Sequence, residues 1–351
     1  MKGQTKKRKG EHINICLKKD VSYSHNYFDD MQFEHDALTE LDYGDLDTSA
    51  RFLKHDLNCP FMVCAITGGY NDAIRINKGL ASACEKYGIA FGLGSQRAML
   101  EDKGLTKTYC VRDVAPTIPV VGNIGAAQLA AYKPVQINDM LKDVGADYLA
   151  IHLNTLQELI QPEGDRDFRG LAERINIIVR EIEFPVILKE TGAGITRSVV
   201  ERIARKGIPV AGIDVAGSGG TSWAKVEEYR GGNARQFGEW GSPTPICTME
   251  VARTGIFTIA SGGIRTGLDA AKALSLGAHI AGGARVFMDA YFKKRLEQEI
   301  EWWITGLKRT MMLTNSRRVR DLQSANLIIT GKLGRYMHAK GIRVAHFGKR
   351  R

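Results

Sequence analysis

The segment Asp147–Asn154 reads DYLAIHLN, and the residues that follow extend its polar end to HLNTLQE over His152–Glu158. Its first part is a continuous apolar run, as expected for a strand of a parallel sheet covered on both faces. Its last part differs, because His, Asn, Gln and Glu side chains can hold a proton, a metal ion or an amide hydrogen bond. His152 and Asn154 are two residues apart, so on a strand their side chains share a face. The pattern predicts a buried strand that ends where polar groups collect.

Further short apolar runs rich in Val and Ile lie on both sides of this strand in the sequence. They are FMVCAIT (61–67), IAFGLGS (89–95), IPVVGNIG (118–125), PVILKE (185–190), VAGIDVAG (210–217), IFTIASGG (256–263) and HIAGGAR (279–285). Helix-like segments separate many of them, at residues 73–87, 134–146, 171–182, 198–207 and 268–278. Apolar strands that alternate with helices form a parallel sheet.

Eight such strands within residues 61–285 predict an α/β protein of the (β/α)8 TIM-barrel class, for which about 250 residues are typical. A doubly wound open sheet is the alternative, but the glycine fingerprint it carries after its first strand is absent. We therefore expect one barrel domain over residues 1–351, with an N-terminal extension (1–60) and a C-terminal helical segment (286–351). The connection from Ser218 to about Val251 is unusually long, and such barrel loops are often lids or substrate-binding elements.

The expected strands end in polar residues. These are Thr67, Ser95, Asn123, His152 with Asn154, Lys189 with Glu190, Asp214, and Ser261. Catalytic residues of a TIM barrel sit at the carboxyl ends of its strands, so the series predicts a functional barrel mouth.

Two glycine-rich turns follow the seventh and eighth strands. ASGGIRTGLDAAKAL (260–274) reads as strand, turn and helix, and AGGAR (281–285) closes the next strand. Glycines let backbone N–H groups approach an anion, and barrels commonly bind phosphate with these two loops. A flavin phosphate there would place the ring across the mouth, with Lys189 as the positive group near N1 and with Asn123 and Ser95 reading the ring edge. A Schiff-base lysine is the alternative use of Lys189.

Composition limits the other possibilities. The formal net charge is +10, which favours anionic partners in general. The six cysteines form no C-x-x-C pair, so we expect reduced thiols and not a zinc site or disulfide framework. The basic start is not followed by an apolar stretch, and no run approaches the roughly 18 apolar residues of a membrane helix. We expect a cytoplasmic protein without a membrane partner. The basic run RRVR (317–320) accompanies no nucleic-acid recognition motif, so no nucleic-acid partner is expected.

Short motifs in a fixed order give a more specific indication. They are RKGEHI (8–13), AITGG (65–69), GSQR (94–97), GNIGA (122–126), HLNTLQE (152–158), LKE (188–190), GGTSW (219–223) and SGGIRTGLD (261–269). Over nearly its whole length the sequence resembles the type 2 isopentenyl diphosphate isomerases, the FMN-dependent kind.

The resemblance implies specific site residues. FMN would be held by Ala65, Ile66, Thr67, Ser95, Asn123, Lys189, Thr221, Gly263, Arg265, Gly283 and Ala284. The substrate would be bound by Arg8, Lys9, His12, Ser95, Gln96, Arg97, His152, Asn154, Gln157 and Trp223. Gln157 would be the catalytic side chain beside the isoprenyl carbons, and Glu158 would bind Mg²⁺. Two positions depart from the family pattern, Thr155 where Pro is frequent and Ala216 where a hydroxyl residue is frequent.

The implied reaction is an allylic proton shift between isopentenyl and dimethylallyl diphosphate, with reduced FMN, Mg²⁺ and NAD(P)H as the reductant. The resemblance also implies a homo-oligomer, a tetramer or an octamer. An FMN-dependent oxidoreductase of the 2-hydroxy acid oxidase type on the same barrel is the alternative. Those enzymes place a catalytic His soon after the sixth strand, where this sequence reads VAGSGGTSW (215–223).

Overall fold

The computed structural model describes residues 2–350, and the side chains of residues 10–350. Its centre is a closed barrel in which eight parallel strands follow one another in chain order, and the last pairs with the first. The strands are β4 Phe61–Val63, β5 Ala90–Gly92, β6 Val120–Gly125, β7 Tyr148–Leu153, β8 Val186–Glu190, β9 Gly212–Asp214, β10 Phe257–Ser261 and β11 Ile280–Gly283. Each predicted apolar run contains one of them, so the predicted (β/α)8 barrel is confirmed.

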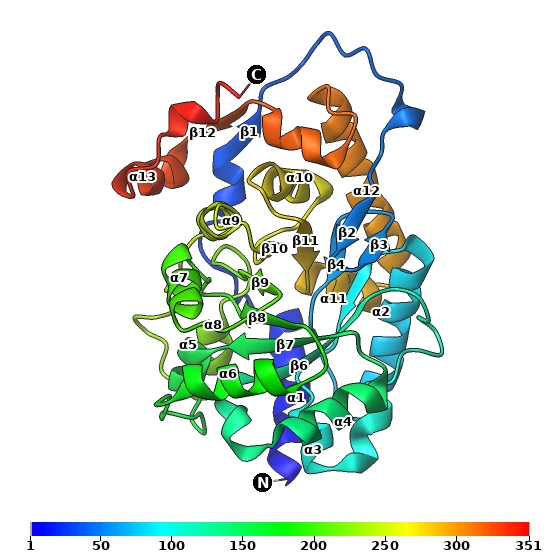
Figure 1. Ribbon diagram of the computed structural model, residues 1–351, viewed down its shortest axis with the longest axis vertical. Helices are drawn as coiled ribbons and strands as arrows, with labels where there is room; N and C mark the ends of the chain where they lie inside the picture. Colours follow the sequence, from blue (N-terminus) through cyan, green and yellow to red (C-terminus); the bar gives the residue numbers. More distant parts are fainter. Residues whose placement is uncertain (1, 351) are drawn as a thin grey trace.

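Helices surround the barrel (Figure 1). They are α1 Lys2–Lys18, α2 Ala73–Tyr87, α3 Arg97–Glu101, α4 Pro134–Val144, α5 Thr155–Ile160, α6 Leu171–Glu181, α7 Arg197–Arg205, α8 Trp223–Glu228, α9 Thr244–Ala252, α10 Gly267–Ser275, α11 Arg285–Phe292, α12 Leu296–Leu313 and α13 Gly331–Ala339. Helix α4 begins with a proline and ends before Gly145, whose φ of 64° is the left-handed conformation that glycine adopts easily. Local sequence therefore sets its limits.

Strand β7 shows how the alternation of a strand separates two cores. Leu149 and Ile151 pack outward in the layer between the strands and the helices. Tyr148 and Ala150 point into the barrel, where they pack against residues of the other strands. The same alternation continues to His152, so its side chain belongs to the interior face at the carboxyl end of the barrel.

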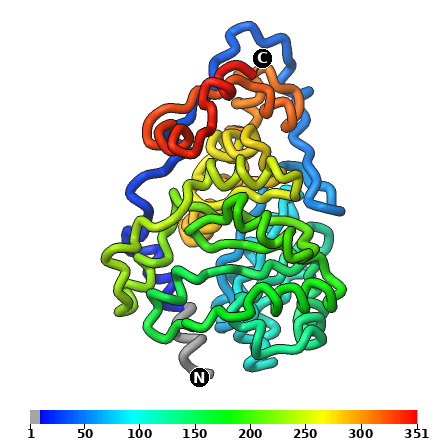
Figure 2. The backbone as a smooth tube through the Cα atoms, turned by 60° about the vertical axis from the view of Figure 1, so that its left-hand side comes forward, coloured from blue at the N-terminus to red at the C-terminus, as the bar shows by residue number. Residues whose placement is uncertain are grey.

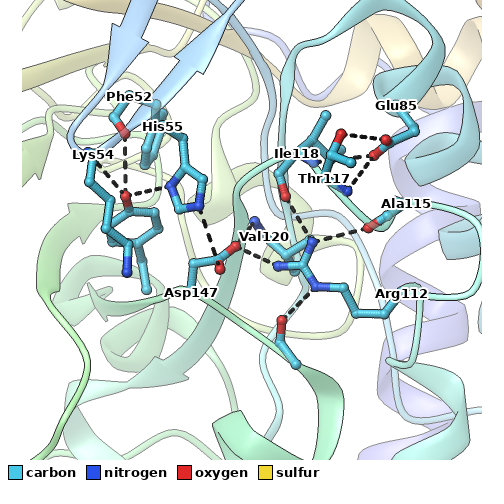
Figure 3. Close-up of polar contacts among 12 residues, drawn as sticks. Phe52, Lys54, His55, Glu85, Arg112, Ala115, Thr117, Ile118, Val120 and Asp147 are labelled. Atoms are coloured by element: carbon cyan, nitrogen blue, oxygen red, sulfur yellow. Dashed lines mark hydrogen bonds and ion pairs between the residues drawn. The ribbon is translucent and has the colours of Figure 1, made fainter.

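A short hairpin closes the opposite end of the barrel. Strands β2 (Ala50–Phe52) and β3 (His55–Leu57) pair antiparallel, and buried Phe52 and Leu57 join the interior core. Nδ1 of His55 lies 2.8 Å from the Tyr148 hydroxyl, as part of the network of polar contacts at this end (Figure 3). Asp147 accepts N–H bonds from Arg112 at 2.5 Å and from the Val120 backbone at 2.8 Å. The N-terminal extension thus seals the base of the barrel, which sequence analysis did not predict.

The remaining parts of the extension pair with distant segments. Strand β1 (Met31–Phe33) forms a two-stranded antiparallel sheet with β12 (Leu327–Ile329). Helix α1 lies toward one end of the long axis, and β12 lies toward the other (Figures 1 and 2). Helix α1 packs on α3 and α8, and its Cys16 joins Val226 and Met288 in a small apolar cluster beside the barrel mouth. Within residues 2–350, no helix combines the length and the apolar character needed to cross a bilayer.

Candidate active site

A cavity of about 750 Å³ lies at the carboxyl ends of the barrel strands. That volume is within the range of small-molecule and cofactor sites. The predicted site residues that line it are His12, Ala65, Ile66, Thr67, Ser95, Arg97, Asn123, His152, Asn154, Gln157, Glu158, Lys189, Thr221, Trp223, Gly263, Arg265, Gly283 and Ala284. The backbone of Arg8 and Lys9 belongs to α1, but their side chains lie outside the described residues.

Gln96 differs from the other predicted residues because its side chain is not part of the cavity lining. It is fully buried, and its Oε1 accepts the backbone N–H of Asn123 at 2.9 Å. Asn123 in turn places its Oδ1 2.8 Å from Nδ1 of His152. In this structure Gln96 therefore supports two cavity residues from behind.

Gln157 is held by a carboxylate that sequence analysis missed. Its Nε2 donates to Oε1 of Glu227 at 2.8 Å, and the same carboxylate lies 2.9 Å from Nε2 of His12. Arg230 donates to the other oxygen of Glu227 at 2.6 Å. The His12 ring also packs edge-on against Trp223, with 5.2 Å between ring centroids.

Glu227 has no exposed surface. Burial would raise the pKa of its carboxyl group, but the bonds from His12, Gln157 and Arg230 outweigh burial and leave that pKa below its ordinary value. In the sequence, VEEYR (226–230) resembles an ordinary solvated helix face. The location of Glu227 in the long connection after the sixth strand was the single feature that could have drawn attention to it.

Glu158 has a buried carboxylate beside Gln157. Its Oε1 accepts from the Asn154 amide at 3.1 Å, and its Oε2 accepts from the Asp165 backbone at 3.0 Å. A carboxylate has about four lone-pair sites, so two donors leave acceptor capacity for a cation. Within the part of the chain that the structure describes, no three His, Cys, Asp or Glu side chains form a metal-binding group.

Lys189 forms a buried ion pair at the mouth. Its Nζ lies 2.5 Å from Oδ2 of Asp214, and the Ser261 hydroxyl donates to Oδ1 of Asp214 at 2.6 Å. Burial by itself would lower the pKa of Lys189, but the adjacent carboxylate outweighs it, and the net shift is upward. The ammonium is therefore retained, which disfavours the neutral amine that a Schiff-base lysine needs.

The glycine turns bring the loops after β9 and β10 into contact. A Cβ on Gly220 would lie 2.5 Å from the Gly263 backbone nitrogen, and one on Gly262 would lie 2.2 Å from the Gly217 carbonyl oxygen. Gly262 and Gly263 also have φ angles of 95° and 78°, a conformation that other residues rarely adopt. Side chains at these positions would collide with the opposing backbone, so the glycines allow the two loops to pack against each other beside the cavity.

Two arginines at the end of the cavity that is expected to bind phosphate contact residues of the N-terminal extension. Arg265 lines the cavity, but its guanidinium is bound by Asp29 and Asp269. Arg285 also lines the cavity and donates to the Ser22 hydroxyl at 3.1 Å. Ser22 and Asp29 come from the N-terminal extension. Nothing in the sequence indicated that this segment contributes to the site.

Two other mouth residues have unusual surroundings. The Thr67 hydroxyl is buried and has no hydrogen-bond partner among the described residues. Such an orphaned group at a cavity wall indicates a ligand or a water. Ala216, one of the departures from the family pattern, has a φ of 36°. This left-handed conformation is unfavourable for alanine and marks strain at the mouth.

Comparison with known proteins agrees with these features. A protein-family model described as FMN-dependent dehydrogenase matches residues 152–329. Curated relatives named isopentenyl-diphosphate delta-isomerase match nearly the entire chain. One from Methanothrix thermoacetophila is 41% identical over 99% of this chain and 100% of its own length. One from Methanothermobacter thermautotrophicus is 42% identical, over 98% and 99% of the two chains. The chain belongs to the isopentenyl-diphosphate delta-isomerase family. The names of the relatives, together with the match to the FMN-dependent dehydrogenase model, confirm the predicted family.

Solved structures of other flavoproteins share the fold. A mandelate oxidase variant carrying an FMN adduct has a TM-score of 0.61 at 14% identity, over 87% of this chain and 90% of its own. A flavocytochrome b2 variant with pyruvate bound has a TM-score of 0.63 at 17% identity, over 89% and 81% of the two chains. At such low identity these likenesses show the barrel fold alone.

Proposed function

We propose that the protein interconverts isopentenyl diphosphate and dimethylallyl diphosphate, with FMN across the barrel mouth and Mg²⁺ on Glu158. One observation carries the proposal: the polar end of β7 and the glycine turns after β10 and β11 line the same cavity. The names of the relatives support the substrate class. The match to the FMN-dependent dehydrogenase model supports the cofactor.

The residues present fit FMN. Gly263, Gly283 and Ala284 line the cavity and would hold its phosphate with their backbone, and the unpartnered Thr67 hydroxyl offers a hydrogen bond. The Asn123 amide and the Lys189 ammonium suit the polar edge of the ring. Reduced flavin would supply an acid–base group that adds a proton at one end of the allylic unit and removes one at the other.

The chain's own side chains would bind and orient the diphosphate. His12, Arg97 and His152 line the cavity, and charge-assisted bonds from such groups are strong. Arg8 and Lys9 on α1 are proposed to add two further positive charges. Glu158 would give Mg²⁺ one oxygen, and substrate phosphates and water would complete its shell, as is common for this ion.

Gln157 is proposed to stand beside the isoprenyl carbons. Its amide nitrogen is committed to Glu227, and its amide oxygen lies 3.5 Å from the Asn154 amide nitrogen. These two contacts fix which way the amide faces. A fixed amide can position a water or substrate carbon without itself changing charge.

The test is the ratio of NAD(P)H consumed to dimethylallyl diphosphate formed, measured without oxygen. An isomerase returns its electrons in every cycle, so one reduction should support many turnovers and the ratio should fall far below one. Product formed in D₂O should also carry deuterium. Full activity with oxidised FMN, or one reductant per product, would refute the proposed reaction.

The alternative, an FMN-dependent oxidoreductase of the 2-hydroxy acid oxidase type, would reduce its FMN with the hydroxy acid and form no dimethylallyl diphosphate in this assay. Its expected catalytic His after β9 is absent from VAGSGGTSW (215–223), which favours the isomerase. The proposed tetramer or octamer is checked separately, by light scattering of the purified protein.

A further inference from the structure

The Lys189–Asp214 pair is built into the strand register of the barrel. The two residues are direct partners at the ends of β8 and β9. Their side chains are 13% and 3% exposed, and Ser261 from the next strand, β10, fixes the second oxygen of Asp214. Three neighbouring strands therefore hold the carboxylate against the ammonium.

Two other groups near Lys189 are able to carry negative charge, and both are accounted for. Oε2 of Glu190 accepts backbone N–H groups from the loop that follows it, at 2.6 Å from Thr191 and 2.5 Å from Gly192. Burial raises the pKa of the Cys64 thiol to about 12, so Cys64 remains neutral near pH 7. Asp214 is left as the anion that directly contacts Lys189.

A small cavity of about 10 Å³ lies beneath the pair. Asn123, Lys189 and Asp214 provide its polar wall, and Leu93 and Ile187 are among the apolar residues that complete it. The pair thus lies between the main cavity and the dry barrel core. Electrostatic effects of a single charge are larger in such surroundings than in water.

We propose that Asp214 is a positioning residue that holds the Lys189 ammonium in place and partly neutralises it, so that the bound flavin faces an ion pair instead of a lone positive charge. This inference rests on the proposed FMN site. A lone ammonium near N1 would stabilise negative charge on the reduced ring. The ion pair weakens that stabilisation relative to a lone ammonium.

Sulfite binding to the FMN-loaded protein measures the field at the ring. The sulfite sulfur forms a bond to N5 of oxidised flavin, and the displaced electron pair appears as negative charge at the N1–C2 edge, so no other reactant is needed. Asp214→Asn removes the negative charge and should tighten sulfite binding at least tenfold. Binding is measured by the bleaching of the flavin absorbance. A tenfold change in the equilibrium constant for two-electron reduction of the flavin corresponds to a rise in its midpoint potential of about 30 mV.

Controls separate this effect from folding and from the proposed function. Asp147→Asn, at the opposite end of the barrel, should leave sulfite affinity unchanged. Adding Asp214→Asn to a Lys189→Met background should tighten sulfite binding less than in the wild type, because only the direct charge effect of Asp214 is left and its positioning of the ammonium is gone. Where Asp214→Asn does not accumulate as folded protein, Asp214→Ser removes the same charge with a smaller side chain.

The outcomes are distinguishable. Unchanged or weaker sulfite binding in the neutral variants, or equal tightening without Lys189, would overturn the role of Asp214. A wild-type protein that does not bind FMN would instead overturn the proposed function. Tightening that is larger with Lys189 than without it, and that is absent in Asp147→Asn, supports the inference.

Discussion

Replacing Glu227 by glutamine tests how the amide of Gln157, the proposed catalytic side chain, is held. In the wild type the carboxylate accepts from Gln157 and Arg230 and contacts His12, all within 2.9 Å. A glutamine in its place has one acceptor oxygen, and its amide nitrogen must face donors on one side. If the oxygen stays with Arg230, the amide of Gln157 has to rotate.

The magnitude follows from these contacts. A hydrogen bond to a charged group contributes about 1.5–3 kcal/mol, and Glu227 is fully buried, so solvent does not compensate. We expect Glu227→Gln to lower the free energy of unfolding by about 2–3 kcal/mol and Tm by about 3–4 °C. A misplaced reacting group can reduce a rate about 100-fold, and we expect kcat of the isomerisation to fall by about that factor.

The assay combines three measurements on one preparation: FMN content by absorbance, Tm by calorimetry and anaerobic turnover of isopentenyl diphosphate. FMN content should not change. Glu228→Gln, the exposed neighbour on the same helix, is the matched control and should behave as wild type. A Glu227→Gln enzyme with wild-type kcat and Tm would refute the reasoning.

The pH dependence of stability gives an independent check. Because the pKa of Glu227 is lower in the folded protein than its ordinary value of 4.5, its contribution is present above about pH 4.5 and is lost as pH falls through the lower, folded-state pKa. The difference in Tm between wild type and Glu227→Gln should therefore shrink in that acidic range. A difference that grows on acidification would contradict the assigned direction.

Three further predictions follow from the site and the fold. Glu158→Gln should retain FMN but lose activity that depends on Mg²⁺, and unchanged activity at limiting Mg²⁺ would remove the metal assignment. Deleting residues 1–12 should leave the flavin-loaded barrel folded and raise KM sharply, since charge-assisted contacts to the diphosphate are lost; a normal KM would show that the basic run does not bind substrate. Asp147→Asn weakens a mostly buried ion pair with Arg112 and should cost about 1–2 kcal/mol of stability without changing kcat, as checked by denaturant unfolding and turnover. A fall in kcat in Asp147→Asn would mean that changes at this end of the barrel affect the active site at the other end.

Sequence by itself determined the barrel and most of its mouth. Apolar strands are recognisable from short local runs, and a series of parallel strands that turn polar only at their ends is typical of a barrel mouth. The register then places His152, Lys189 and Asp214 around one opening, because carboxyl ends of parallel strands share an edge. The predicted cavity residues followed from that single geometric rule and from the family motifs.

Tertiary structure decided which groups hold those residues. Glu227 contacts Gln157 across 70 positions of sequence, and Asp29 contacts Arg265 across 236. Such partners are chosen by how loops pack, and a charged residue on a short helix has the same local pattern whether it is buried or solvated. For the same reason, the packing of the β2–β3 hairpin through Phe52 against the barrel interior and the pairing of β1 with β12 appear only in the folded chain. Local periodicity reports which face of a strand is apolar, whereas the identity of a distant partner depends on the closed shape of the whole barrel.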